Sequence, residues 1–340
     1  MPRAVSGETE LPEKLNALTQ QFAAVFLPGG HQFSIASLGF AFCAAVVFLA
    51  LRQWRRRGRV HIAALARAIF SKRIILHRST RADVCYFILN TFAIGALIGW
   101  TCLSGETIAK IVLEAFQDAF GARAPVTGPD MVLRAGMTLL IFLTYELGYW
   151  LDHYLSHRIP FLWEFHKPHH TAQVLTPWTV WRVHPVDTLV FTNILALTIG
   201  PVTGFATYLL GRETAVYAID GTNILLVAFI YAYVHLQHSQ FWIPFTGGIG
   251  RVLMSPAQHQ IHHSRDPVHF NRNFGSCLAL WDWLFGTLAM PAAQSPRLTY
   301  GVEDPGADAH SLRQLLIAPV QNAAAGLGVQ TAMPIAGTQE

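Results

Sequence analysis

The sequence has little charge, few cysteines and no long polar linker. Only 13% of its 340 residues are charged, whereas 52% are hydrophobic, and the mean hydropathy is +0.34. Charge this low and hydrophobicity this high argue against an ordinary soluble domain. Because apolar segments recur from residue 34 to residue 234 without a polar linker between them, the sequence predicts one integral membrane domain.

The scarcity of cysteine excludes two kinds of site. The chain has four cysteines and no CxxC pair, which indicates neither a disulfide framework nor a thiolate metal site. They are interpreted as packing residues: Cys43, Cys85, Cys102 and Cys277. No cleavable signal peptide is expected either, since the first apolar run starts late, and that run should remain as an anchor.

Much of the net charge of +4 comes from one basic run, residues 52–59, which holds five arginines directly after an apolar stretch. Basic residues at that place mark the cytoplasmic end of a membrane span. The run has neither aromatic stacking partners nor a recognisable nucleic-acid-binding module around it. Nucleic acid is therefore not expected as a partner.

Apolar stretches long enough to cross a membrane determine the expected fold. They are residues 34–51, 84–103, 131–151, 188–210 and 214–234, the fourth of them interrupted by Gly200 and Pro201. The fold class predicted is an all-α integral membrane protein with about four to five transmembrane helices and a cytosolic histidine-rich helical cap. Before the first stretch, residues 11–27 have helical spacing and could lie on the membrane surface or form a short soluble helix.

Charge predicts how these spans are oriented. Segment 52–83 carries ten Lys or Arg residues against a single acidic residue, Asp83, so we expect it in the cytoplasm. The second span then runs outward, residues 104–130 form an external connection, and the third span returns. The histidines that begin at His153 would thus face the cytoplasm, and two later crossings would bring a second histidine group to the same side. A bacterial inner membrane is the expected location.

Twelve of the sixteen histidines lie between residues 153 and 269, and eight of them form three boxes. The first box pairs two histidines four residues apart, so that both imidazoles share one helix face. The other two follow the pattern HxxHH, and in the second box Pro168 is expected to permit a helix only from about that position. In chain order the boxes are His153 and His157; His166, His169 and His170; and His259, His262 and His263.

Eight imidazoles are too many for one metal ion. Histidine binds iron, copper, zinc and nickel alike, so the residue type does not select the metal. Structural zinc takes four ligands, commonly with cysteine, and catalytic zinc typically three. A lone buried histidine is more often a hydrogen-bonded packing residue, but three matched boxes without metal would leave many nitrogens unsatisfied. The pattern therefore predicts two metal ions, and their place beside apolar helices suggests O2 activation on a lipid C–H bond.

The histidine boxes and the segments around them resemble the fatty acid hydroxylase/sterol desaturase superfamily in the order and spacing of their residues. They are Asp152–Arg158, Leu162–His166, Arg182–Pro185, Ser255–Ser264, Asn273–Gly275 and Trp281–Thr287. The resemblance implies a helical membrane fold, two iron ions bound by histidines, O2 as co-substrate, and hydroxylation or desaturation of a membrane lipid. Electrons would come from a redox protein of the ferredoxin or cytochrome b5 type with its reductase.

The resemblance also points to residues outside the boxes. His238 is expected as a ninth ligand, and His235 could join it. His184 is interpreted as a ligand, a hydrogen-bond donor to a ligand, or a turn residue. Hydrogen-bond partners of the ligands are predicted among acids and one amide that could instead cap helices: Glu146, Asp152, Asp187, Asn273 and Asp282. His269 lies in a polar loop and is expected to be exposed, and no catalytic residue separate from the ligands is predicted.

The chain is expected to fall into four segments. They are an N-terminal amphipathic or flexible segment at 1–33, N-terminal transmembrane helices and connections at 34–130, a fatty acid hydroxylase-like catalytic domain at 131–320, and a disordered tail at 321–340. Two other function classes compete with a lipid oxygenase. A histidine-rich metal-binding or transport protein would place its ligands near the bilayer midplane, whereas these boxes follow span ends. A metal-free membrane scaffold would need no ordered boxes.

Overall fold

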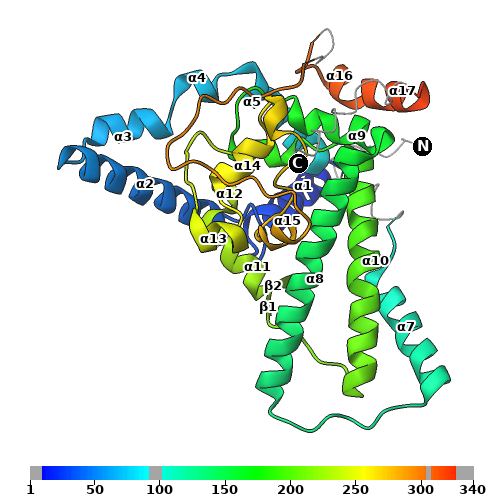
Figure 1. The fold of residues 1–340 in the computed structure, drawn as a ribbon. Coiled ribbons are helices and arrows are strands. Elements are labelled where there is room, and N and C mark those ends of the chain that lie inside the picture. Colours follow the sequence, from blue (N-terminus) through cyan, green and yellow to red (C-terminus); the bar gives the residue numbers. More distant parts are fainter. Residues whose placement is uncertain (1–9, 92–101, 304–307, 327–340) are drawn as a thin grey trace, which may run out of the picture.

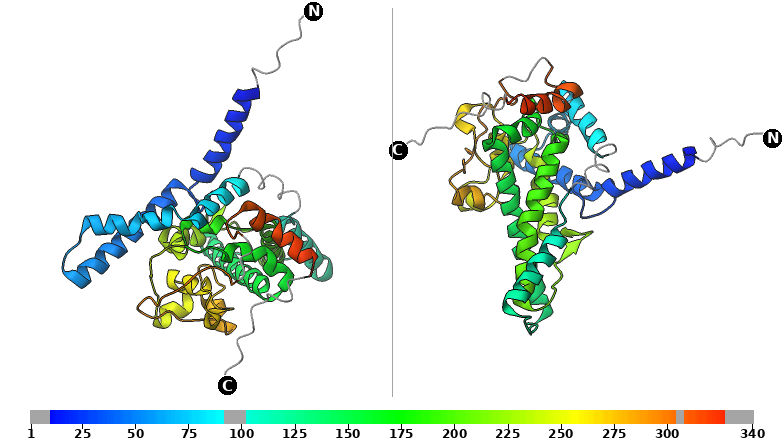
Figure 2. Two further views of the ribbon diagram at one scale, coloured as in Figure 1. Left: turned by 90° about the horizontal axis from the view of Figure 1, so that it is seen from above. Right: turned by 90° about the vertical axis from the view of Figure 1, so that its right-hand side faces the viewer.

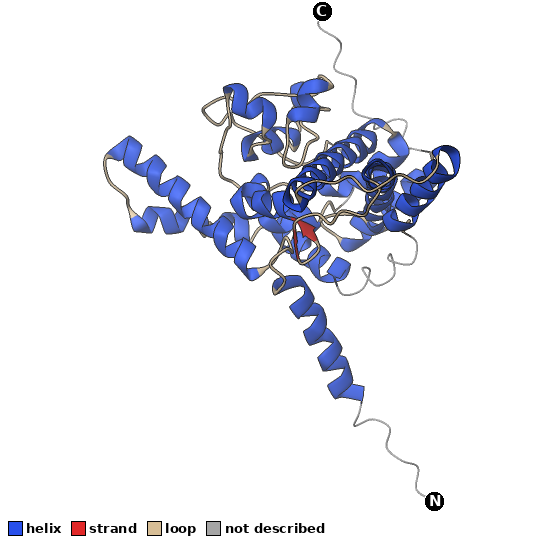
Figure 3. Ribbon diagram, turned by 90° about the horizontal axis from the view of Figure 1, so that it is seen from below, coloured by secondary structure: helices blue, strands red, loops and turns tan. Residues whose placement is uncertain are grey.

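The computed structural model describes residues 10–91, 102–303 and 308–326, and this part of the chain is mainly helical (Figure 1 and Figure 3). Its one sheet is a two-stranded antiparallel hairpin of β1 (Ala218–Ile219) and β2 (Thr222–Asn223). The predicted all-α class is confirmed.

Three helices stand side by side and project away from the rest of the molecule: α7 (Gly105–Phe120), α8 (Asp130–Arg158) and α10 (Pro185–Leu210) (Figure 1). Gly200 and Gly204 lie where α10 meets α7, and a Cβ at either position would collide with α7. Small residues of this kind let membrane helices approach closely. The predicted interruption at Gly200 and the following proline is therefore wrong, because α10 continues through both and uses the glycine for packing.

A fourth long helix, α2 (Ile35–Arg57), runs crosswise to the direction of α8 and α10 and extends to one side of them (Figure 1 and Figure 2). Its buried side consists of Ser37, Ala41 and Ala45, and the last of these packs against Tyr233 and Leu236. Helix α1 (Glu10–Phe26) covers the amphipathic stretch predicted at 11–27 and extends away from the body (Figure 2). The C-terminal end of α2 projects away from the rest of the molecule together with the helix that follows it (Figure 1).

Within the described residues, α2, α8 and α10 are long and apolar enough to cross a membrane. These helices match the stretches predicted at 34–51, 131–151 and 188–210, the first of which begins at the residue that caps α2. The stretch at 84–103 begins in α5 (Arg78–Leu89), and its remainder lies largely outside the described residues.

The last predicted span, residues 214–234, is not one long helix. The β1–β2 hairpin interrupts it, because Asp220 and Gly221 at the turn both adopt positive φ angles. The apolar helix that follows covers only Ile224–Gln237. A helix of that length is shorter than the roughly 20 residues that a full crossing requires.

The shorter elements lie around the C-terminal half of α8, except α3, which folds back beside α2; together they form the cap (Figure 1). They are α3 (Ile62–Ile69), α4 (Lys72–Ile75), α9 (Pro160–His170), η3 (Pro177–Trp181), α11 (Ile224–Phe229), the π-helical η4 (Ile230–Val234), α12 (His235–Gln237), α13 (Gly247–Val252), α14 (Pro256–His262), η5 (Pro267–His269), α15 (Leu280–Leu284), α16 (Leu312–Leu316) and α17 (Ala318–Ala324). Helix α17 reaches into the tail predicted from residue 321, and residues 327–340 lie outside the described part.

Candidate metal centre

Helices α8 and α9 meet at a sharp corner that faces two histidine boxes toward each other. Helix α8 ends at Arg158, and Pro160 occupies the first turn of α9, where its missing N–H is not needed. Pro168 lies inside α9, which runs through it to His170. The expectation that a helix begins only near Pro168 is thus wrong: the whole second box lies on one helix.

The third box lies on α14, whose start is held by a capping box. The Ser255 hydroxyl accepts a hydrogen bond from the Gln258 N–H, and the Gln258 side chain accepts one from the Ser255 N–H. His238 directly follows α12 and joins α14 from the side. Helix α14 and His238 thus bring the third box to the same buried region as the second box.

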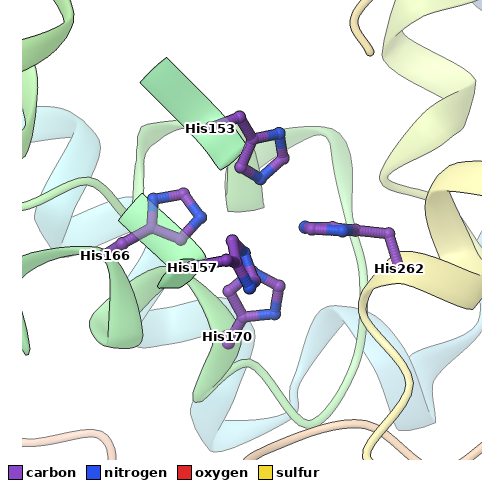
Figure 4. Close-up of side chains that lie close together, drawn as sticks. All are labelled: His153, His157, His166, His170 and His262. Carbon is purple, nitrogen blue, oxygen red and sulfur yellow. The ribbon is translucent and has the colours of Figure 1, made fainter. Parts of the chain in front are cut away.

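The structure gathers nine of the predicted ligands into two groups, and within each group the ring nitrogens lie within 4.8 Å of one another. All nine side chains are buried. Group one is His153, His157, His166, His170 and His262, whose rings converge in Figure 4. Group two is His169, His238, His259 and His263. The groups are adjacent, since the ring centroids of His170 and His263 are 4.7 Å apart.

Helical periodicity explains which histidine joins which group. Residues four apart on a helix differ by about 40° around its axis, whereas the residue between them in an HxxHH box is turned by about 100° from its neighbour. His166 and His170 therefore both face group one, and His169 faces group two. In the third box the same rule sends His259 and His263 to group two. The remaining histidine of that box crosses to group one.

Distances between the ring nitrogens fit metal coordination. The Nε2 of His238 lies 3.2, 3.1 and 2.9 Å from the Nε2 atoms of His169, His263 and His259. A neutral imidazole carries one N–H, so hydrogen bonding alone cannot satisfy three such contacts. Two nitrogens bound to one metal at about 2.1 Å, with ligand angles of about 90° to 109°, lie about 3.0 to 3.4 Å apart. The observed spacing agrees with nitrogens that share one ion.

Group one carries a second sign of metal binding, because its outward-facing nitrogens are already engaged. The Nδ1 atoms of His153 and His262 lie 2.8 Å from the carbonyl oxygens of Phe274 and Arg272. The Nδ1 of His166 lies 3.0 Å from an Asp187 carboxylate oxygen. The Nε2 atoms of the same three rings are buried without a hydrogen-bond partner in the described chain. A metal ligand commonly donates its second N–H to an oxygen in this way.

Several of these histidines are also held in the protonation state that metals require. Burial lowers the pKa of His238 and of His262 to about 3, and it lowers the pKa values of His169, His170 and His259 as well. Neutral imidazoles offer a free lone pair to a metal ion. These five side chains are thus neutral donors at physiological pH.

Two of the predicted outer partners act through the backbone instead of on an imidazole. Asp282 accepts hydrogen bonds from the N–H groups of Phe274 and Gly275. The Asn273 side chain bonds Gln258 and Ala289, and its φ of 58° turns the chain between the two carbonyls that receive His153 and His262. These residues therefore hold the carbonyls in place.

The other three predicted partners, Asp187, Glu146 and Asp152, differ in the groups that they contact. Asp187 contacts His166 as described, whereas the Glu146 carboxylate accepts the N–H groups of Cys277 and Leu278. Asp152 is buried, but in the described chain no hydrogen bond joins it to an imidazole.

Three other histidines lie outside both groups. His184 caps α10, with its Nδ1 accepting the Val186 N–H and its Nε2 3.0 Å from the Leu316 carbonyl oxygen, which is the turn role among the predicted alternatives. His235 packs against Phe33 and lies 3.4 Å from the Ser37 hydroxyl. His269 is half-buried and contacts the Ser264 hydroxyl.

One supporting residue was not predicted as part of the site. Arg182 is fully buried, and its Nε donates to the Pro168 carbonyl within the second box. The same guanidinium donates to an Asp83 carboxylate oxygen at 2.9 Å and to the Thr171 hydroxyl. The one available signal was an arginine two residues before His184 in a segment of the family resemblance.

Comparison with known proteins is consistent with this geometry. The sequence profile of the fatty acid hydroxylase family matches residues 138–287. The chain is 28% identical over 177 residues to the alkylglycerol monooxygenase of Danio rerio, covering 49% of this chain and 33% of that protein. It is 30% identical over 167 residues to an ornithine lipid hydroxylase of Rhizobium tropici, covering 49% and 46%.

A third relative is human cholesterol 25-hydroxylase, 27% identical over 199 residues, with 55% of this chain and 65% of that protein covered. The matches thus span between about a third and two thirds of these relatives. No solved structure matches the chain.

Proposed function

The chain belongs to the fatty acid hydroxylase/sterol desaturase superfamily, and on this basis we propose that it is a membrane-bound di-iron oxygenase that hydroxylates or desaturates a lipid. Two adjacent groups of buried histidines, five and four in number, carry the proposal. Group one would hold one iron and group two the other. Bound iron would supply the O2 and one-electron chemistry that amino-acid side chains lack.

The residues around the site suit a reaction that must exclude water. Phe274 is fully buried, and its ring packs against those of His153, His157 and His262. Trp163, also buried, covers the rings of His157 and another group-one histidine. An apolar wall of this kind keeps bulk water from a strong oxidant. The protein's own part is to place the ligands and keep the site dry.

The substrate we propose is a membrane lipid. By their names, the relatives act on alkylglycerols, an ornithine lipid and cholesterol. The helices that are long and apolar enough to span a membrane support the same substrate class. We further propose that the site faces the cytoplasm, where a redox protein would deliver electrons, since ten Lys or Arg residues occupy segment 52–83.

Two measurements test the function. Purified protein is expected to contain about two iron ions per chain, in line with a two-metal site. Mass spectrometry of lipids from cells with and without the gene should show one species that gains an oxygen or loses two hydrogens. Iron-free protein that still produces that species would contradict the assignment.

Asp187 offers a graded test of ligand positioning. We expect Asp187→Ala to weaken iron retention by about 10- to 100-fold, because His166 loses the acceptor that orients its ring. Asp187→Asn keeps an oxygen acceptor and should lose less. Iron retained against a chelator measures both variants, and equal losses would show that the negative charge, not the hydrogen bond, is what matters.

A further inference from the structure

A cavity lies away from the histidines, between the C-terminal part of α2 and the loops that contain Trp242 and Ala293. Its volume is about 300 Å³. Three arginines of α2 line one side, and the rest of the wall is apolar: Phe48, Leu51, Arg52, Arg55, Arg56, Trp242, Pro244 and Ala293. The proposed oxygenase reaction gives this cavity no role.

The arginines of the cavity have no counter-charge. Among the described residues, no carboxylate forms an ion pair with Arg52, Arg55 or Arg56. A helix C-terminus favours nearby cations, which explains why arginines end α2. The helix dipole does not explain why three of them share a cavity with a tryptophan. Like charges held close together are stabilised by an anion, and guanidinium groups match phosphate oxygens in geometry.

The cavity joins this charge to an apolar surface. Helix α2 is apolar before Arg52, and as a whole it is long and apolar enough to cross a membrane. Trp242 on the opposite wall is buried, and its indole N–H donates to the Ala292 carbonyl. Phe48 and Leu51 extend the apolar lining toward the body of α2. A ligand that has an acyl chain and a negatively charged group would match both the apolar lining and the arginines.

We propose that this cavity binds the phosphate headgroup of an anionic membrane phospholipid. Basic residues just outside a membrane span commonly attract such lipids. Here three arginines on one helix line the same cavity, whereas basic residues in a loop attract lipids without a defined site. Phosphatidylglycerol is the probe we choose, because its headgroup carries the phosphate and no cation.

The bound headgroup would connect α2 to the metal centre. Trp242 lies four residues after His238, in a segment that α14 holds. The Gln260 side chain donates to the carbonyls of Ser239 and Phe241, at 2.9 Å each. A phosphate held between α2 and Trp242 thus braces the segment that carries a group-two ligand.

The test uses the full-length protein in nanodiscs of phosphatidylcholine with or without phosphatidylglycerol. The cavity variant is Arg52→Gln/Arg55→Gln/Arg56→Gln. Its matched control, Arg57→Gln/Arg59→Gln/Arg67→Gln, removes the same charge from nearby positions that do not line the cavity. Phosphatidylglycerol co-purifying with the protein, counted by native mass spectrometry, and the thermal shift that this lipid causes are measured for each protein.

We expect the wild type and the control to retain and be stabilised by phosphatidylglycerol, and the cavity variant to lose about a hundredfold in affinity, at about fivefold per arginine. Equal losses in cavity variant and control would overturn the proposal in favour of diffuse surface attraction. Stabilisation of the detergent-solubilised protein by inorganic phosphate alone, equal to that by the lipid, would overturn it in favour of a free anion. The single variant Arg56→Gln, expected to lose about fivefold, keeps the test valid if the triple variant folds poorly.

Discussion

A His238→Ala variant is expected to lose more than about a hundredfold of its activity and one of its two iron ions, because removing even an outer partner of a metal ligand costs about 10- to 100-fold. The Nε2 of His238 lies within 3.2 Å of the Nε2 atoms of all the other group-two histidines. Its Nε2 is thus shared by all the nitrogen contacts that join His169 to the rest of the group, and its loss removes one ligand from the middle of the site. Group one contains no contribution from His238 and should keep its ion.

Iron content and product formation are the two measurements for this variant. His184→Asn is the matched control, since it also alters a buried histidine and asparagine is an equally good helix cap. That control should retain about two iron ions and normal turnover. The reverse pattern, with iron lost in the His184 variant and kept in the His238 variant, would refute the assignment of ligands.

An Arg182→Ala variant is expected to be the least stable of the single variants, with a loss of about 3 to 5 kcal/mol in the free energy of unfolding. The change leaves Asp83 as an uncompensated buried charge, since both side chains of the pair are 0% exposed. It also removes the donor to the Pro168 carbonyl between two histidines of the second box. Thermal unfolding in detergent measures the stability, and iron content reports on the box.

Two further variants separate the effect of the charge of Arg182 from the effect of its several hydrogen bonds. Arg182→Lys keeps the charge, but a single ammonium cannot replace donors that reach Pro168, Asp83 and Thr171 together. It should regain part of the stability and little of the iron. Arg212→Ala breaks an exposed ion pair with Asp130 and should cost only about 0 to 1 kcal/mol. Equal destabilisation by Arg182→Ala and Arg212→Ala would contradict the role of the buried pair.

The local sequence pattern was sufficient to predict features that depend on residues close together in the chain. Apolar stretches predicted the long helices, and the spacing of three boxes together with His238 predicted the nine histidines that converge. Errors arose where tertiary packing overrode local signals. The glycine at position 200 packs α10 against α7 instead of breaking it, and the turn at Asp220 shortens an apolar stretch that composition alone would let span a membrane.

The sequence by itself determined that this is a helical membrane protein with paired histidine groups, because hydropathy and helical periodicity act over a few turns of one chain segment. Only the tertiary structure decided which group each histidine serves, which backbone carbonyls orient the rings, and that Arg182 pairs with Asp83, 99 residues away. Every residue type has a backbone carbonyl, so the sequence does not show which carbonyl will accept a hydrogen bond. Contacts between residues far apart in the chain depend on the tertiary fold. The α8–α9 corner and the path of the 271–275 segment set those positions.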